Sequence, residues 1–195
     1  MSIISCNQIN YLRKNIGKIL VFFTIYLLGI ILALFFYGNT SKQSLLQSNA
    51  QNYYIIIFNP SSSYLTAFFK CFLAGFFLSF TTLILGLSIY SIPFVSVILF
   101  YRGVILGTSF IIFFTLSGIS GIVLFIILTL PIHLIITFGL IIASVLNYKC
   151  QCVDLKSKIV ICSKNAIISI LFSLIASLYL IFILITIIRP INLLF

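Results

Sequence analysis

An arginine and a histidine, both set among apolar residues, are the groups in this chain most able to do chemistry. Arg102 lies in the stretch LFYRGVILG (99–107) and is the only formally charged residue between Cys71 and Tyr148. His133 is the only histidine and follows Pro131 in TLPIHLIIT (129–137). Ionisable groups are costly inside a bilayer and usually serve a function there. Both become candidate site residues if the surrounding segments cross a membrane.

The environment of Arg102 has several alternatives, because arginine keeps its charge in proteins and no acid lies in the surrounding segments. Its guanidinium could donate to backbone carbonyls and to hydroxyls, for which Tyr101 and Tyr90 are candidates. It could also extend to lipid phosphates, line a water-filled cavity or pair with an acid of another protein. A further alternative is a break at Tyr101–Gly103 between two half-helices.

Pro131 and His133 form a second candidate group. Proline lacks a backbone N–H and would free the carbonyl of Ile127, so we expect a kink whose freed group is satisfied inside the protein or by water. The lone histidine could move protons or bind a metal. Since no carboxylate is available in the apolar segments to orient it, a structural histidine bonded to a freed carbonyl is the favoured interpretation.

The remaining reactive residues do not form a recognisable catalytic or metal site. Cys6, Cys71, Cys150, Cys152 and Cys162 are odd in number, and a fourth ligand for a zinc site is missing. Asp154 is the only acid, so the chain has neither a carboxylate pair nor an acid-oriented serine–histidine pair. We therefore predict no enzymatic activity, no metal and no cofactor.

Composition identifies the class of protein. The 195 residues are 63% hydrophobic and 6% charged, whereas soluble domains are about 25% charged. The formal charge of +10 comes from eleven basic residues that cluster beside apolar runs. Such clusters indicate membrane topology and contact with anionic lipid rather than nucleic-acid binding. The sequence predicts a single all-α integral membrane domain over residues 1–195.

Five apolar segments are long enough to cross a bilayer, for which about 20 residues are needed. They are Ile19–Tyr37, Cys71–Tyr90, Pro93–Leu116, Gly121–Val145 and Ala166–Ile188. The first has no cleavage signal after it and reads as an uncleaved anchor. Pro93 suits the first turn of a helix. The connections Ser91–Ile92 and Ser117–Ser120 are short, so the second to fourth segments should be antiparallel neighbours.

Basic residues predict the orientation of these spans. Seven of them flank the first span or lie in the loop Asn147–Asn165: Arg13, Lys14, Lys18, Lys149, Lys156, Lys158 and Lys164. The positive-inside rule then places the N-terminus in the cytoplasm and the C-terminus outside. The external loop Gly38–Phe69 is interpreted either as a plain connection lying on the bilayer or as a docking surface for an external partner.

Small residues four apart predict close helix contacts, because helices in a bilayer associate through tight packing. The pairs are Gly75 and Ser79, Gly103 and Gly107, Ser117 and Gly121, Gly139 and Ala143, and Ser173 and Ser177. They predict spans that pack against protein, either within the chain or in a partner. A homo-oligomer is one form that such a partner could take.

The order of three motifs resembles the stage II sporulation protein M family of small polytopic membrane proteins. LGLSIYSIP (85–93), with Gly86 and Pro93, resembles its glycine-ended span followed by proline. LFYRGVILG, with Arg102, Gly103 and Gly107, resembles its apolar run carrying one polar or basic residue between spaced glycines. TLPIHLIIT resembles its proline-centred span.

The resemblance implies a scaffold role in endospore formation. Family members reside in the mother-cell membrane and recruit two peptidoglycan-degrading proteins, stage II sporulation proteins D and P, to the engulfing membrane, and catalysis belongs to those partners. The alternative function is a transporter or exporter permease subunit with a polar pathway near Arg102, Pro131 and His133.

Overall fold

The structure, a computed structural model, describes residues 6–38, 64–88, 91–148 and 155–188. These ranges are helical almost throughout and contain no strand, which confirms the all-α prediction for them. The helices are α1 (Cys6–Lys14), α2 (Ile16–Gly38), α4 (Tyr64–Gly86), α5 (Ser91–Leu124), η1 (Phe125–Thr129), α6 (Leu130–Tyr148), α7 (Leu155–Ile183) and η2 (Leu184–Ile188). Here η1 and η2 are single π-helical turns.

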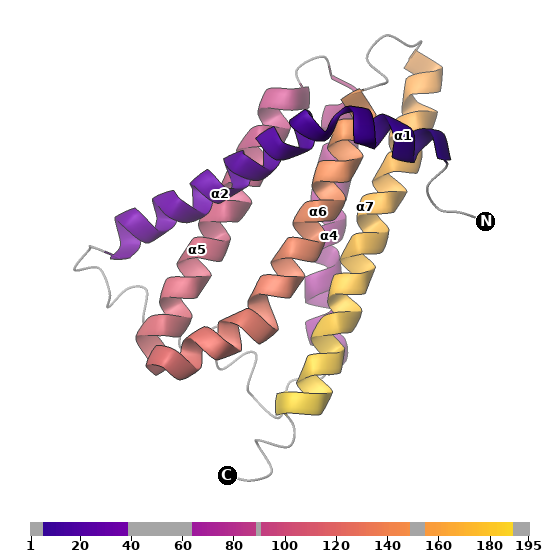
Figure 1. The fold of residues 1–195 in the computed structure, drawn as a ribbon. Helices are drawn as coiled ribbons and strands as arrows, with labels where there is room; N and C mark the ends of the chain where they lie inside the picture. Colours follow the sequence, from indigo (N-terminus) through magenta and orange to yellow (C-terminus); the bar gives the residue numbers. More distant parts are fainter. Residues whose placement is uncertain (1–5, 39–63, 89–90, 149–154, 189–195) are drawn as a thin grey trace.

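Four helical segments are long and apolar enough to cross a membrane: Ile16–Phe36, Leu65–Gly86, Ile92–Tyr148 and Lys156–Thr186. The chain is therefore a multi-pass membrane protein. The third segment has 57 residues and contains the predicted third and fourth spans. It reverses direction at Gly118, whose φ of 58° and ψ of −130° are open to glycine but strained for other residues. Gly118 falls in the predicted connection Ser117–Ser120, and Figure 1 shows the chain turning back from α5 toward α6 there.

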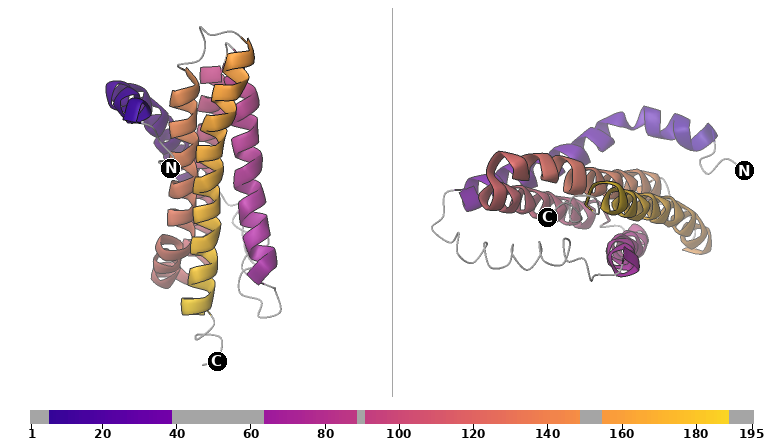
Figure 2. Two further views of the ribbon diagram at one scale, coloured as in Figure 1. Left: turned by 90° about the vertical axis from the view of Figure 1, so that its right-hand side faces the viewer. Right: turned by 90° about the horizontal axis from the view of Figure 1, so that it is seen from below.

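The helices form two packed groups, α2 with α5 and α4 with α6 and α7, and α6 also contacts α5. α2 lies obliquely along α5, while α7 is sandwiched between α6 and α4 (Figures 1 and 2). Buried apolar residues from α2, α5, α6 and α7 connect the groups: Phe22, Val95, Leu99, Ile136, Leu140, Ile141, Val145 and Ala176. Outward-facing residues such as Phe35 and Phe182 are also large and apolar, as a lipid-facing surface requires.

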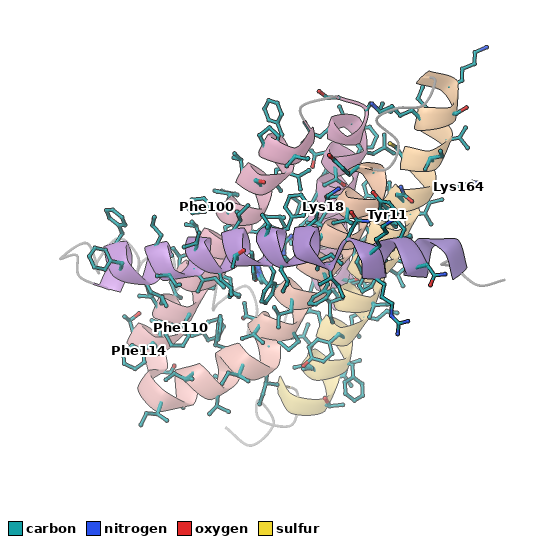
Figure 3. The ribbon with its side chains drawn as sticks, turned by 45° about the horizontal axis from the view of Figure 1, so that its top comes forward. Tyr11, Lys18, Phe100, Phe110, Phe114 and Lys164 are labelled. Atoms are coloured by element: carbon teal, nitrogen blue, oxygen red, sulfur yellow. The ribbon has the colours of Figure 1, made fainter. Side chains whose placement is uncertain are left out.

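The reversal at Gly118 is supported by aromatic contacts. Phe110 and Phe114 are stacked on the part of α5 that approaches the turn (Figure 3), with ring centroids 6.4 Å apart. Phe125 of η1 packs edge-on against Phe110 at 5.3 Å. Gly121 lies directly against the carbonyl of Phe113, where a side chain would collide. The predicted pair Ser117 and Gly121 thus builds this turn.

Four helices begin earlier than the sequence predicted. α2 starts at Ile16 rather than Ile19, and α5 starts at Ser91 rather than Pro93, so the predicted connection Ser91–Ile92 is helical. The differences are larger for α4 and α7. α4 starts at Tyr64, so the last six residues of the predicted external loop are helical, and residues 39–63 of that loop lie outside the described residues. α7 starts at Leu155 rather than Ala166, so residues 155–165 are helix instead of loop. The lysines of this stretch lowered its hydropathy, but Lys158 is buried and its Nζ donates to the carbonyl of Leu87 at 2.9 Å.

Small polar residues join α4 to α7 and α6 to α7. Ser79 and Ser169 share a hydrogen bond of 2.7 Å, and Ser173 donates to the carbonyl of Phe72 at 3.2 Å. An added Cβ on Gly75 would lie 2.6 Å from the Ser173 Cβ. Near the end of α6, the Asn165 amide of α7 donates to Asn147 Oδ1 at 2.9 Å. These contacts agree with the prediction that small residues mark helix interfaces.

The helix is distorted before Pro131, and the freed backbone group has a specific partner. The π-helical turn η1 ends at Thr129, two residues before Pro131. Pro131 has no N–H to donate to the carbonyl of Ile127. This carbonyl instead accepts a hydrogen bond of 2.8 Å from the Tyr179 hydroxyl of α7. The expectation that His133 would satisfy this carbonyl is wrong, because a tyrosine from another helix occupies that position.

Tyr179→Phe should lower the free energy of unfolding by about 1–2 kcal/mol, because it leaves the Ile127 carbonyl without a donor in an apolar environment. In a Pro131→Ala background, Tyr179→Phe should lower the free energy of unfolding by less, because the alanine N–H can donate to the Ile127 carbonyl. SDS titration of the four proteins in a double-mutant cycle measures this coupling. Tyr101→Phe, at an exposed tyrosine of α5, is the control and should have no effect. Equal costs of Tyr179→Phe in both backgrounds would contradict the pairing.

Candidate site: an intramembrane arginine cluster

Three helices bring four polar side chains together, which we call the Arg102 cluster: Tyr26 of α2, Arg102 of α5, and His133 and Thr137 of α6. His133 and Thr137 are four residues apart and share one helix face. Arg102 lies about 17 Å along α5 from Ser91 at 1.5 Å per residue. In a hydrocarbon core about 30 Å thick, this places the cluster near the centre.

The reversal at Gly118 explains why Arg102 and His133 meet. Arg102 precedes Gly118 by 16 residues and His133 follows it by 15. Residues equally distant from the turn of an antiparallel helix pair lie at about the same height. The sequence contains this signal, because Arg102 and His133 lie at nearly equal distances from the short connection Ser117–Ser120.

Arg102 is deeply buried and weakly paired. Only 6% of its surface is exposed, and its Nη2 lies 3.5 Å from Nδ1 of His133. Arginine has no acceptor atom, so Nδ1 is the acceptor and the imidazole carries its proton on Nε2. This hydrogen bond is longer than the usual 2.7–3.2 Å range and involves a neutral partner. The positive charge of Arg102 is therefore not neutralised by His133.

Arg102 Nε has no hydrogen-bond partner in the described structure, and the Tyr26 hydroxyl and Thr137 Oγ1 adjoin each other without a well-formed hydrogen bond to any group. Tyr26 is 0% exposed and Thr137 is 1% exposed. Thr137 and Arg102 are the polar neighbours of the Tyr26 hydroxyl, and the Cys71 thiol of α4 is also within electrostatic range of Arg102. Unsatisfied buried polar atoms are rare and call for an explanation.

The structure decides between several environments predicted for Arg102. α5 is regular through Tyr101–Gly103, and its only irregular backbone is at Gly118, so the predicted break into half-helices is wrong. Tyr101 is 63% exposed and faces away from the buried Arg102 side chain. Tyr90 lies outside the described residues. The guanidinium is enclosed by protein near mid-membrane depth, which also excludes the predicted extension to lipid phosphates.

Close approach of α2 and α5 encloses the cluster on one side. Gly103, the residue after Arg102, lies against Gly29 of α2, and an added Cβ would collide with the Tyr26 carbonyl. One turn further, an added Cβ on Gly107 would lie 2.7 Å from that of Ala33. Gly103 and Gly107 were predicted as a contact, but their partner was not. The matching spacing of Gly29 and Ala33 in the first span was the available signal.

The other predicted site residues lie at helix ends. Pro93 is exposed in the first turn of α5, as predicted. Gly86 is the last residue of α4, where an added Cβ would lie 2.6 Å from the Asn147 amide nitrogen. Pro131 is on the helix that carries His133, two residues before it. Among the described residues, no group of three or more His, Cys, Asp or Glu could hold a metal ion. Cys150 and Cys152 fall outside that part of the chain.

Neither family models, curated proteins nor solved structures gave a match to this chain. Its function is therefore inferred from the motifs and from the geometry of the described helices.

Proposed function

We propose that the protein is a non-catalytic membrane scaffold, similar to stage II sporulation protein M, that recruits peptidoglycan-degrading partners to the engulfing membrane during endospore formation. The supporting observation is that the motifs carrying this resemblance are joined in space. Arg102 of LFYRGVILG contacts His133 of TLPIHLIIT, and Gly86 of LGLSIYSIP lies against Asn147 at the end of the helix that TLPIHLIIT begins. The partners proposed by resemblance are stage II sporulation proteins D and P.

We further propose five membrane crossings, with the N-terminus in the cytoplasm and the C-terminus outside. The Lys18 ammonium lies 3.4 Å from the ring centroid of Tyr148, so the start of α2 and the end of α6 share one end of the bundle (Figure 3). The Lys158–Leu87 hydrogen bond brings the start of α7 and the end of α4 together in the same way. This arrangement gathers basic residues on one side, as a cytoplasmic face requires.

Cysteine labelling in intact cells tests this orientation. In a cysteine-free background, Ser48→Cys in the predicted external loop should react with a membrane-impermeant maleimide added outside. Lys14→Cys and Lys156→Cys should react only after permeabilisation. Labelling of Lys14→Cys in intact cells would overturn the orientation.

Partner recovery tests the scaffold function. We expect a tagged copy, purified from crosslinked membranes of sporulating cells, to bring down peptidoglycan hydrolases. A variant with residues 39–63 scrambled tests whether the external loop is the docking surface, and its partner yield should fall at least tenfold at equal expression. Absence of hydrolases from the wild-type sample would reject the proposal.

A second candidate, a transporter or exporter permease subunit, is favoured by one observation. Arg102 and His133 meet near mid-membrane depth with unsatisfied donors around them, beside a helix distorted at η1 and Pro131. Such groups mark solute pathways in many membrane proteins. Flux in proteoliposomes that is lost in Arg102→Met and retained in Lys70→Met would support this function, and absence of flux in the wild type would reject it.

A further inference from the structure

We propose that the Arg102 cluster binds a small monovalent inorganic anion of the halide class inside the membrane domain. This inference names a ligand for the cluster on which the second candidate function rests, but it requires neither flux nor partner recruitment. It follows from the charge of the cluster, from its unsatisfied donors and from the depth at which they lie.

The buried positive charge of Arg102 has no counter-charge in the protein, which is the first reason to infer a bound anion. Arg102 is only 6% exposed, and its guanidinium lies beside a neutral imidazole. The only acid of the whole chain, Asp154, falls in sequence between α6 and α7 and outside the membrane spans. A buried charge without a counter-charge is strongly unfavourable. A bound anion supplies the missing charge.

The hydrogen-bond donors of the Arg102 cluster are the second reason to infer a bound anion. Arg102 Nε is buried without a partner. The Tyr26 hydroxyl and Thr137 Oγ1 are also buried and adjoin each other, so even a hydrogen bond between them leaves one of the two hydroxyl protons free to donate. Thr137 is unusual among the hydroxyl residues of these helices. Ser79, Ser144 and many others donate to a carbonyl three or four residues earlier in their own helix, whereas Thr137 does not. Its hydroxyl instead faces the Tyr26 hydroxyl, and this pair of hydroxyls can donate to a ligand that only accepts hydrogen bonds.

The source of the anion follows from its surroundings. The Gly29–Gly103 contact closes one side of the cluster, and both hydroxyl side chains are fully enclosed by protein. A lipid phosphate has the same acceptor chemistry, but it would have to move about 15 Å from the interface to reach mid-membrane depth. A dissolved halide carries one charge in a small volume and does not bring a lipid with it.

An anion titration tests the site. The purified full-length protein is placed in phosphatidylcholine nanodiscs, and chloride replaces gluconate at constant ionic strength. We expect saturable binding of radioactive chloride and a rise of about 3–8 °C in the midpoint of thermal unfolding, as ligand binding to the folded state gives for a protein of this size. Both effects should be absent in Arg102→Met and unchanged in Lys70→Met, which removes one exposed positive charge.

A second variant keeps the test decisive if Arg102→Met does not fold. The double substitution Tyr26→Phe and Thr137→Val retains the arginine and should weaken chloride binding at least tenfold. No saturable binding to the wild type, or equal binding to Arg102→Met, would overturn the inference. A stabilisation that needs phosphatidylglycerol and not chloride would also overturn it, in favour of a lipid phosphate. Hydrolase recovery is measured separately, so either proposal can fail alone.

Discussion

Gly103→Leu should prevent accumulation of stably folded protein. The backbones of α2 and α5 meet where Gly103 faces Gly29, and even a single added Cβ would collide with the carbonyl oxygen of Tyr26. Relief of this overlap requires the two helices to separate, which removes close packing along the whole contact. We expect a loss of about 3 kcal/mol or more, at the upper end of the range for overpacked cores. The yield of monodisperse protein in detergent and its SDS unfolding midpoint measure the loss.

The same helix provides a control for Gly103→Leu. Gly17 lies on α2 with nothing within 4 Å of an added Cβ, so Gly17→Leu should leave the yield and the unfolding midpoint nearly unchanged. Arg102→Lys, at the neighbouring position, should also disturb folding less than Gly103→Leu does. Equal amounts of folded Gly103→Leu and wild-type protein would contradict the close α2–α5 contact.

Arg102→Met should stabilise the protein when no small anion is present. Methionine retains an unbranched apolar side chain and removes a buried charge that has only a neutral histidine beside it. Replacement of buried charged groups by apolar residues often raises stability by 1–4 kcal/mol, and we expect a gain of about 2 kcal/mol here. SDS titration in gluconate measures the gain, and in saturating chloride the gain should shrink.

Lys70→Met separates this effect from a general response to charge. Lys70 is exposed on α4, so its replacement should change the free energy of unfolding by less than about 0.5 kcal/mol. Destabilisation by Arg102→Met in gluconate would show that the guanidinium is satisfied within the protein, contrary to the unpaired Nε in the structure. If Arg102→Met is more stable than the wild type but no longer binds chloride, this result would be typical of a residue that is retained for function rather than for folding.

The sequence predicted the helical class, the reversal near Gly118 and the small-residue interfaces, because hydropathy and glycine spacing are local properties. It did not predict which helices meet. The contact of Gly103 with Gly29 and the hydrogen bond from Tyr179 to Ile127 join residues that are far apart in the chain. The start of α7 was missed because hydropathy treats every lysine as solvated, whereas Lys158 is buried at the end of α4.

The candidate site was predicted in part. Arg102, Pro131 and His133 stand out because polar groups and proline are rare in apolar segments. Tyr26 and Thr137 do not stand out, because tyrosine and threonine are common in membrane helices and usually find a partner nearby. Their relevance depends on burial without a hydrogen-bond partner, which only a three-dimensional arrangement shows.

The hydrogen bonds made by α7 have a consequence for biogenesis. Lys158 donates a hydrogen bond to the carbonyl of Leu87, and Tyr179 donates one to the carbonyl of Ile127. The hydroxyls of Ser169 and Ser79 share a hydrogen bond. The last of these long helices to leave the ribosome therefore satisfies polar groups on α4 and beside Pro131 that were inserted earlier. Until then, the nascent chain carries the Ile127 carbonyl without its Tyr179 donor in the lipid or in the translocon. Chains stalled before Leu155 should accordingly be substrates for membrane chaperones and quality-control proteases.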